Sequence, residues 1–254
     1  MINKYQAKAC TKETPMFKRK RPQSEIFANF DWWDKGCFLY QMTVDRCDYI
    51  EACLTRVFGM GALAQQEILE VGCGGGLICE DLARRKAVMV GIDPSEGALE
   101  TARIHARQQG LGQNIFYEQA VAESLPFADG SFSVIVSLDV LEHVGNLKAT
   151  IAEVARVLAP GGVFVFDTIN RTLLARAILI WYGEHFPSGG LKPGIHNYHQ
   201  FIKPPELTGL LTASGLQVRE LRGFMPRGFV HGRFKMGPGW FKGISYVGYA
   251  TKGR

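Results

Sequence analysis

The sequence predicts an α/β fold in which helices cover both faces of a mostly parallel sheet of seven strands. Three observations predict it: short apolar runs alternate with helical stretches from Glu67 onward, a glycine-rich loop follows the first run, and glycine and proline separate the later units. Of the 254 residues, 46% are hydrophobic and 21% charged, which is enough to bury a full core without disulfides. We therefore expect residues 25–254 to form a single domain.

Seven apolar runs are the expected strands. Most are rich in β-branched or aromatic residues and are bounded by Gly, Pro, Asp or Ser, as buried strands usually are. In chain order they are Glu67–Val71, Val88–Asp93, Ile115–Glu118, Phe132–Ser137, Val163–Phe166, Gln217–Leu221 and Ser245–Ala250.

Four helices are expected between and after these strands. They are Leu77–Arg85, a helix capped by Ser95 and ended by Gly110, Leu147–Leu158 stopped by Pro160-Gly161-Gly162, and Pro205–Ala213. Residues 172–200 and 222–244 do not repeat the βα unit. We interpret both segments as lid or insertion material over the carboxyl edge of the sheet, where open α/β sheets bind ligands.

Positive charge is concentrated at the start of the chain. The net charge is +5, and residues 1–21 carry seven Lys and Arg side chains against one Glu. Such a segment suits attraction to an anionic membrane or nucleic acid, but we expect residues 1–24 to be a solvated, flexible tail. The sequence shows neither a secretory apolar region nor an apolar run near the ~20 residues that span a bilayer. Six scattered cysteines without a C-x-x-C pair favour a reducing, cytoplasmic setting.

The glycine loop Glu70-Val-Gly72-Cys-Gly74-Gly75-Gly76-Leu77 indicates a ligand-binding turn. A dinucleotide fingerprint that begins at Gly72 requires glycine where this chain has Leu77. The loop also lacks the lysine that a P-loop offers to phosphates. It is therefore better suited to a ligand without phosphates.

Two acids stand beside this loop. Asp93 ends the second expected strand, about 20 residues further on, where an acid accepts hydrogen bonds from ribose hydroxyls. Glu70 can help to anchor an amino-acid moiety through neighbouring backbone and water. A nucleoside joined to an amino acid through a sulfonium is S-adenosylmethionine, which we predict as the cofactor. The alternative is that Asp93 only caps the next helix.

The motifs resemble those of class I methyltransferases. The matching stretches are E-V-G-C-G-G-G, G-I-D-P-S, A-E-S-L-P-F and F-S-V-I-V-S-L-D-V-L-E-H. The resemblance implies a Rossmann-like fold, a first motif that holds the methionine part, an acid on the ribose, and residues near adenine after strand three. The cofactor-binding residues expected from motif, resemblance and position are Arg46, Glu70, Gly72, Gly74, Asp93, Pro94, Ala122, Glu123 and Leu138.

Further stretches are similar to the ubiquinone-biosynthesis O-methyltransferases over about residues 25–252. They are Trp32-Trp33-Asp34, Arg46 with Tyr49-Ile50, Asn170-Arg171, Lys203–Leu207 and Phe234–Gly239. The resemblance implies a phenolic acceptor on a polyprenylated ring, typically a catechol, peripheral association with membranes, and contact of Arg46 with the cofactor. Leu39–Val44 departs from the family's usual L-H-x-x-N-P, which puts the identity of the substrate in doubt.

Asp139, Glu142 and His143 are the candidate catalytic residues. At positions i, i+3 and i+4 they would share one face of a helix, and their donor atoms suit Mg²⁺ or another divalent cation that a catechol chelates. A second hypothesis has no metal: His143 acts as general base because its pKa lies near the working pH. A third is that the three residues only begin a helix.

Other functions stay open. The acceptor can be another natural-product phenol, or the chain can modify RNA or be a cofactor-binding module without catalysis. Nucleic acid is disfavoured, since the charge is confined to the tail and neither an N-P-P-Y motif nor a Pro-Cys pair is present. The apolar segment Leu173–Trp181 suits a lid for a prenyl tail at the bilayer surface, or ordinary core packing. We expect His196, His199 and His231 to be surface or hydrogen-bonded histidines rather than ligands.

Overall fold

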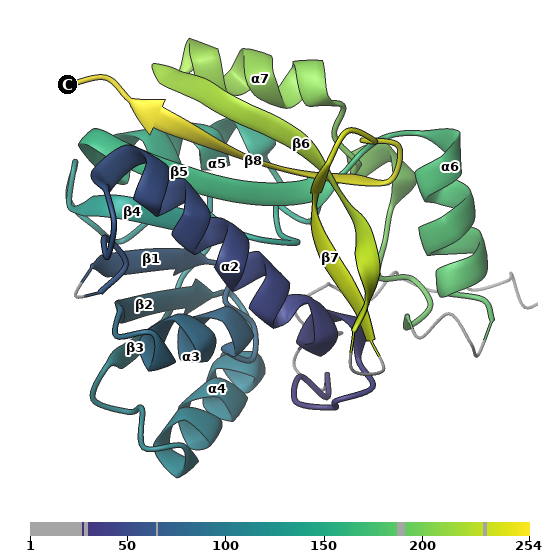
Figure 1. The fold of residues 1–254 in the computed structure, drawn as a ribbon, viewed down its shortest axis with the longest axis horizontal. Helices are drawn as coiled ribbons and strands as arrows, with labels where there is room; N and C mark the ends of the chain where they lie inside the picture. Colours follow the sequence, from purple (N-terminus) through teal and green to yellow (C-terminus); the bar gives the residue numbers. More distant parts are fainter. Residues whose placement is uncertain (1–26, 28–29, 65, 187–190, 231–232) are drawn as a thin grey trace, which may run out of the picture.

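The computed structural model describes residues 27, 30–64, 66–186, 191–230 and 233–254 (Figure 1). The basic tail predicted for residues 1–24 lies outside them, as does His231. Within the described residues, eight strands form one sheet in the order β3-β2-β1-β4-β5-β8-β6-β7. The strands are β1 Glu67–Val71, β2 Val88–Asp93, β3 Ile115–Gln119, β4 Phe132–Ser137, β5 Leu158–Ile169, β6 Leu216–Val230, β7 Arg233–Gly239 and β8 Ser245–Lys252.

All seven expected strands are present, and the α/β fold is confirmed. β1 to β5 pair in parallel, while β8, β6 and β7 add three antiparallel pairings. The expectation of seven strands is wrong by one, because β6 continues to Val230 and pairs there with the unpredicted β7 (Figure 1). This hairpin occupies much of the segment 222–244. Its second strand reads Arg-Phe-Lys-Met-Gly-Pro-Gly, and glycine and proline in such a run argue against a strand.

The helices are α2 Phe38–Phe58, α3 Leu77–Arg84, α4 Glu96–Gln108, α5 Leu147–Val157, α6 Leu173–Ala175 and α7 Pro204–Ala213, with a π-helix η1 at Arg176–Gly183 and a 3₁₀ turn η3 at Tyr198–Gln200. The four expected helices correspond to α3, α4, α5 and α7. Ser95 caps α4 as predicted, because its side chain accepts from the Ala98 backbone N–H.

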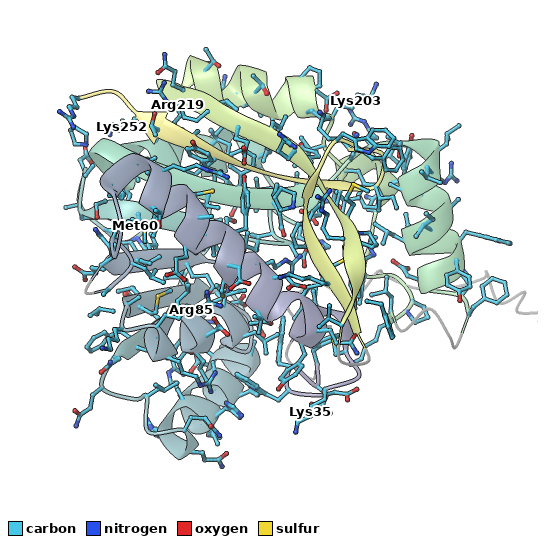
Figure 2. All side chains as sticks on the ribbon, in the orientation of Figure 1. Lys35, Met60, Arg85, Lys203, Arg219 and Lys252 are labelled. Carbon is cyan, nitrogen blue, oxygen red and sulfur yellow. The ribbon has the colours of Figure 1, made fainter. Side chains whose placement is uncertain are left out.

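The longest helix, α2, was not predicted. Its buried residues include Cys47, Ile50 and Leu54, whose spacing of three and four is the helical signal. No polar N-cap marks its start, since Cys37 caps no backbone N–H with its side chain. Arg85, labelled in Figure 2, forms ion pairs with Asp48 and Glu51 of α2 and with Asp81 of α3, and these link the two helices.

The hydrophobic core lies on both faces of the sheet. Side chains alternate along the strands, so Ile68 of β1 joins one cluster and Leu69 joins the other. The first cluster contains buried residues of α2, α3 and α4, and the second contains those of α5 and α7. Helices therefore cover both faces, as expected. In the part of the chain described here, no helix is both long and apolar enough to cross a membrane.

Candidate active site

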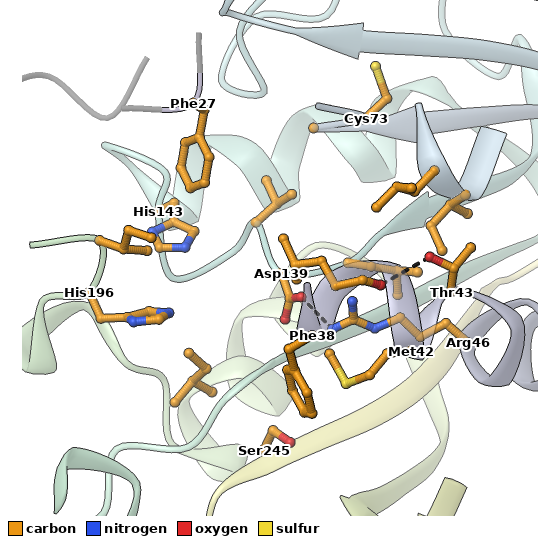
Figure 3. Close-up of a pocket in the computed structure, with 18 of the residues that line it drawn as sticks. Phe27, Phe38, Met42, Thr43, Arg46, Cys73, Asp139, His143, His196 and Ser245 are labelled. Carbon is orange, nitrogen blue, oxygen red and sulfur yellow. Dashed lines mark hydrogen bonds and ion pairs between the residues drawn. The ribbon is translucent and has the colours of Figure 1, made fainter. Parts of the chain in front are cut away.

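A cavity of about 780 Å³ opens at the carboxyl ends of β1, β2 and β4 (Figure 3). α2, η1 and the β6–β7 hairpin complete its walls. Most of the predicted site residues line it: Arg46, Glu70, Gly72, Asp93, Pro94, Ala122, Glu123, Leu138, Asp139 and His143. Gly74 packs against Trp32, which lines the cavity, whereas Glu142 is hydrogen-bonded to Thr168 and does not line it. The cavity is large enough for a nucleoside-sized ligand together with a second small molecule.

The glycine loop has the tight turn that the sequence predicts. Gly72 and Gly74 have φ angles of 79° and 50°, in the left-handed region that glycine adopts without strain. A Cβ atom on Gly72 would lie 2.3 Å from Val140, and one on Gly74 would lie 2.4 Å from the ring of Trp32. Glycine is therefore required at both positions for backbone and side chains to approach so closely.

The Asp93 carboxylate connects the loop to the next helix. Its Oδ2 accepts from the Gly74 N–H at 3.0 Å, and its Oδ1 accepts from the Ser95 N–H at 2.8 Å. Burial raises the pKa of Asp93, although both hydrogen bonds favour the charged form. Because Ser95 is the N-cap of α4, Asp93 supports that cap while it also faces the cavity.

Two further polar groups lie near the loop. Glu70 is buried and accepts from the Cys79 thiol at 2.9 Å, and burial raises its pKa to about 7. Within the described residues, the indole Nε1 of Trp32 is buried without a hydrogen-bond partner. Trp32 lines the cavity, so this donor is available to a ligand. The sequence indicated Trp32 only through a motif resemblance.

Arg46 holds two carboxylates at the cavity wall. Its Nη2 donates to Asp139 (Figure 3), and its Nε lies 2.8 Å from Oδ2 of Asp167. Asp167 also accepts from the backbone N–H of Asp139 at 2.6 Å. Burial alone would lower the pKa of Arg46, but the two aspartates outweigh it and raise the pKa. Asp167, at the end of β5, was not predicted, although an acid that follows the apolar run 163–166 is a usable signal.

The expected metal triad is not assembled. Asp139, Glu142 and His143 lie on a turn before α5 rather than on a helix, and Asp139 has a φ of 54°. Glu142 points away from the cavity and accepts from the Thr168 hydroxyl at 2.7 Å, and burial raises its pKa. Among the residues that the structure describes, no group of three His, Cys, Asp or Glu side chains is placed to hold a metal ion. The expected one-face arrangement fails because the turn sends the three side chains in different directions.

His143 does face the cavity. Its ring lies between the edge of Phe27 and the face of His196, with ring centroids 5.8 and 5.6 Å away (Figure 3). Burial and the neighbouring His196 lower the pKa of His143 to about 4. The expectation of a pKa near working pH is therefore wrong, because a buried imidazole loses the hydration that stabilises its charge. At neutral pH, His143 is an uncharged proton acceptor.

Comparison with known proteins identifies the family of this chain. Residues 69–166 match the family model described as a methyltransferase domain. The ubiquinone biosynthesis O-methyltransferase of Parvibaculum lavamentivorans is 38% identical over 76% of this chain and 78% of the relative. That of Agrobacterium fabrum is 37% identical over 74% and 77%.

The chain belongs to the ubiquinone biosynthesis O-methyltransferase family. It is therefore an S-adenosylmethionine-dependent methyltransferase, and its fold is the Rossmann-like one of class I. A crystal structure of a SAM-dependent methyltransferase from Methanosarcina mazei agrees with this fold: it aligns with a TM-score of 0.55 and 26% identity over 74% of this chain and 93% of that chain.

In this O-methyltransferase, replacing Arg46 by methionine is expected to lower the free energy of unfolding by about 3–5 kcal/mol. The change leaves the buried Asp167 and the partly buried Asp139 without their cation, and an uncompensated buried charge is costly. Chemical denaturation followed by circular dichroism measures this loss.

Arg56→Met is the matched control on the same helix. Its ion pair with Glu220 is half exposed, since 48% of the Arg56 side chain is accessible, and such pairs contribute about 0–1 kcal/mol. Equal losses in the two variants would show that Arg46 is not a special anchor of the cavity wall.

Proposed function

We propose that this enzyme transfers the methyl group of S-adenosylmethionine to a hydroxyl of a prenylated catechol. The observation that carries the proposal is a single cavity in which the Gly72 loop and Asp93 form one end and His143 lies against aromatic and aliphatic walls. The relatives' names as ubiquinone biosynthesis O-methyltransferases support a prenylated ring as acceptor. The apolar walls supply the environment that a prenyl chain prefers.

The cofactor fits the first end of this cavity. Gly72 of the loop lines this end, and the Asp93 carboxylate, fixed by the Gly74 N–H, suits ribose hydroxyls. Glu70 and the unpartnered Trp32 Nε1 are polar groups for the amino-acid part. Pro94, Ala122, Glu123 and Leu138 line the stretch of cavity that we assign to the adenine. Arg46 would act on the cofactor mainly by fixing Asp139 and Asp167.

The base of the reaction is His143. S-adenosylmethionine supplies an electrophilic methyl group whose bonding electrons stay with sulfur when the carbon–sulfur bond breaks. As the new oxygen–carbon bond forms, the phenolic proton becomes strongly acidic, and the neutral His143 imidazole takes it. A base of low pKa suffices for this step, because the proton leaves together with methyl transfer rather than before it.

A divalent cation was the other hypothesis for activating the hydroxyl. The chemistry of Asp139, Glu142 and His143 suits such an ion, but their placement does not, since Arg46 engages Asp139 and Thr168 engages Glu142. We therefore assign proton removal to His143 alone.

The test is methyl transfer to a short-chain prenylated catechol, with added Mg²⁺ and with a chelator. We expect turnover that the chelator leaves unchanged. Loss of turnover with chelator would reject the metal-free role of His143 and restore the cation hypothesis. No turnover in either condition, with cofactor binding confirmed by calorimetry, would mean that the acceptor is a different molecule.

We also propose that α6 and η1 dock on a membrane surface, from which a prenylated acceptor enters. Large apolar side chains are exposed there: Leu173, Leu174, Ile178, Trp181, Tyr182 and Phe186. Ile178 also lines the cavity, so this surface is continuous with the part of the cavity around His143, which we assign to the acceptor. An exposed apolar patch of this kind marks a protein or membrane contact.

Replacing Leu173 and Trp181 by serine is expected to reduce binding to anionic phospholipid vesicles at least tenfold. Both side chains are mostly exposed, at 74% and 64%, so the fold should tolerate the change. Co-sedimentation measures the binding. Met60→Ser is the control, because Met60 is 91% exposed and lies after α2, away from η1 (Figure 2). Unchanged vesicle binding in the double variant would exclude this surface.

A further inference from the structure

A second histidine faces the cavity beside His143. Its ring, that of His196, stacks on the ring of His143 with centroids 5.6 Å apart and an interplanar angle of 27°. A second aromatic contact of this ring is with Phe201, whose ring centroid lies 5.9 Å away at an interplanar angle of 71°. His196 is hydrogen-bonded, as expected, but its ring also lies in the cavity wall, which the sequence did not indicate (Figure 3).

Glu184 fixes the orientation of His196. Its Oε1 lies 2.9 Å from Nδ1 of His196 and accepts from the His196 backbone N–H at 2.8 Å. Its Oε2 accepts from the Gly194 N–H at 2.6 Å. The two side chains are almost buried, at 3% and 10% exposure. The ring is therefore held by a hydrogen bond on one side and by aromatic contacts on its faces and edge.

This arrangement also decides which ring nitrogen carries the proton. Burial opposes ionisation of Glu184, but the hydrogen bonds from His196 and Gly194 outweigh it and lower the pKa of Glu184. An ionised carboxylate only accepts hydrogen bonds, so Nδ1 of His196 must donate to it. In the neutral ring, Nε2 is then an acceptor, and it is the nitrogen that can reach a ligand in the cavity.

We propose that Glu184 and His196 form a hydrogen-bonding clamp for the second hydroxyl of an ortho-diphenol, so that the cavity selects catechols over simple phenols. The inference rests on the proposed acceptor class and adds the residues that recognise it. The two adjacent hydroxyls of a catechol match two adjacent imidazoles: His143 serves the reacting oxygen, and Nε2 of His196 accepts from its neighbour. A simple phenol leaves that acceptor without a partner in a nearly buried place, which disfavours its binding.

The experiment measures binding rather than turnover, so that it stands apart from the test of methyl transfer. Isothermal titration gives the dissociation constants of a short-chain prenylated catechol and of the matched phenol without the second hydroxyl. The protein is the full chain with S-adenosylhomocysteine bound. We expect the wild-type enzyme to bind the catechol about tenfold more tightly than the phenol.

His196→Phe keeps the ring, its volume and its stacking but removes both nitrogens. We expect the preference for catechol to fall to twofold or less, while affinity for the phenol stays within twofold of wild type. Glu184→Gln should weaken the preference in the same direction, because an amide no longer forces Nδ1 to donate. His199→Phe is the matched control: it makes the same change at an exposed position three residues away, and the preference should persist.

Three results would overturn the clamp: no catechol preference in the wild type, an unchanged preference in His196→Phe, or a parallel loss of both affinities in that variant. Absence of methyl transfer with a preserved binding preference would instead reject the proposed reaction and leave the clamp standing. Methyl transfer to both the catechol and the phenol, with equal binding affinities for the two, would reject the clamp and leave the proposed reaction standing.

Discussion

Replacing Asp93 by alanine is expected to lower the affinity for S-adenosylmethionine about 100-fold. The carboxylate faces the cavity and is fixed by the Gly74 and Ser95 N–H groups, so its oxygens are already oriented when a ligand binds. Hydrogen bonds to a charged group contribute about 1.5–3 kcal/mol each, and two of them to a ribose account for a change of this size. Isothermal titration with the cofactor measures it.

Asp129→Ala is the control for this prediction, because its carboxylate is 82% exposed and pairs with Arg156 away from the cavity. Asp93→Asn keeps one acceptor oxygen and replaces the other with an amide NH2 group that only donates, so it should lose about tenfold. A dissociation constant within threefold of wild type in Asp93→Ala would show that Asp93 only supports the N-cap of α4.

Replacing His143 by alanine is expected to lower kcat by about 10²–10³, with the dissociation constant of S-adenosylmethionine within twofold of wild type. Loss of a positioned general base costs about this much, and the imidazole lies in the part of the cavity assigned to the acceptor. Steady-state kinetics with the prenylated catechol measures kcat. His199→Ala, at an exposed position outside the cavity lining, should retain activity.

The pH profile tests the same residue independently. Burial and His196 lower the pKa of His143 to about 4, so the ring stays neutral as the pH falls from 7 to 5. We expect the acid limb that His143 causes in kcat/KM to lie near pH 4 rather than near the usual 6.5 of histidine. An inflection near 6.5 that disappears in His143→Ala would contradict the environment described for this ring.

The parallel half of the fold was predictable because its signals are local. β1, the Gly72 loop and α3 follow one another within a few residues, and the glycines specify a turn that other residues cannot adopt. The same holds for Asp93, whose distance from the loop along the chain follows from the βαβ unit. The cofactor end of the cavity was therefore largely visible in the sequence.

The acceptor end was less visible because it gathers residues from distant segments. His196 meets His143 only because residues 195–196 lie beside the turn before α5, and Asp167 meets Arg46 across β5 and α2. Neither pair has a fixed sequence spacing. The structure brings Asp139 and His143 to the cavity wall but turns Glu142 toward Thr168, since a turn replaces the helix that their spacing suggests.

Sequence alone determined the α/β class, the seven strands with an apolar run, the glycine loop and its acid, because short-range sterics and hydrophobic periodicity specify them. Only the tertiary structure decided the eighth strand, the partners of Arg46, the absence of a three-residue metal group among the described residues, and the pairing of the two histidines. These features depend on side chains that meet only after folding. Burial then lowers the pKa of His143, and the backbone turn decides which way Asp139, Glu142 and His143 point.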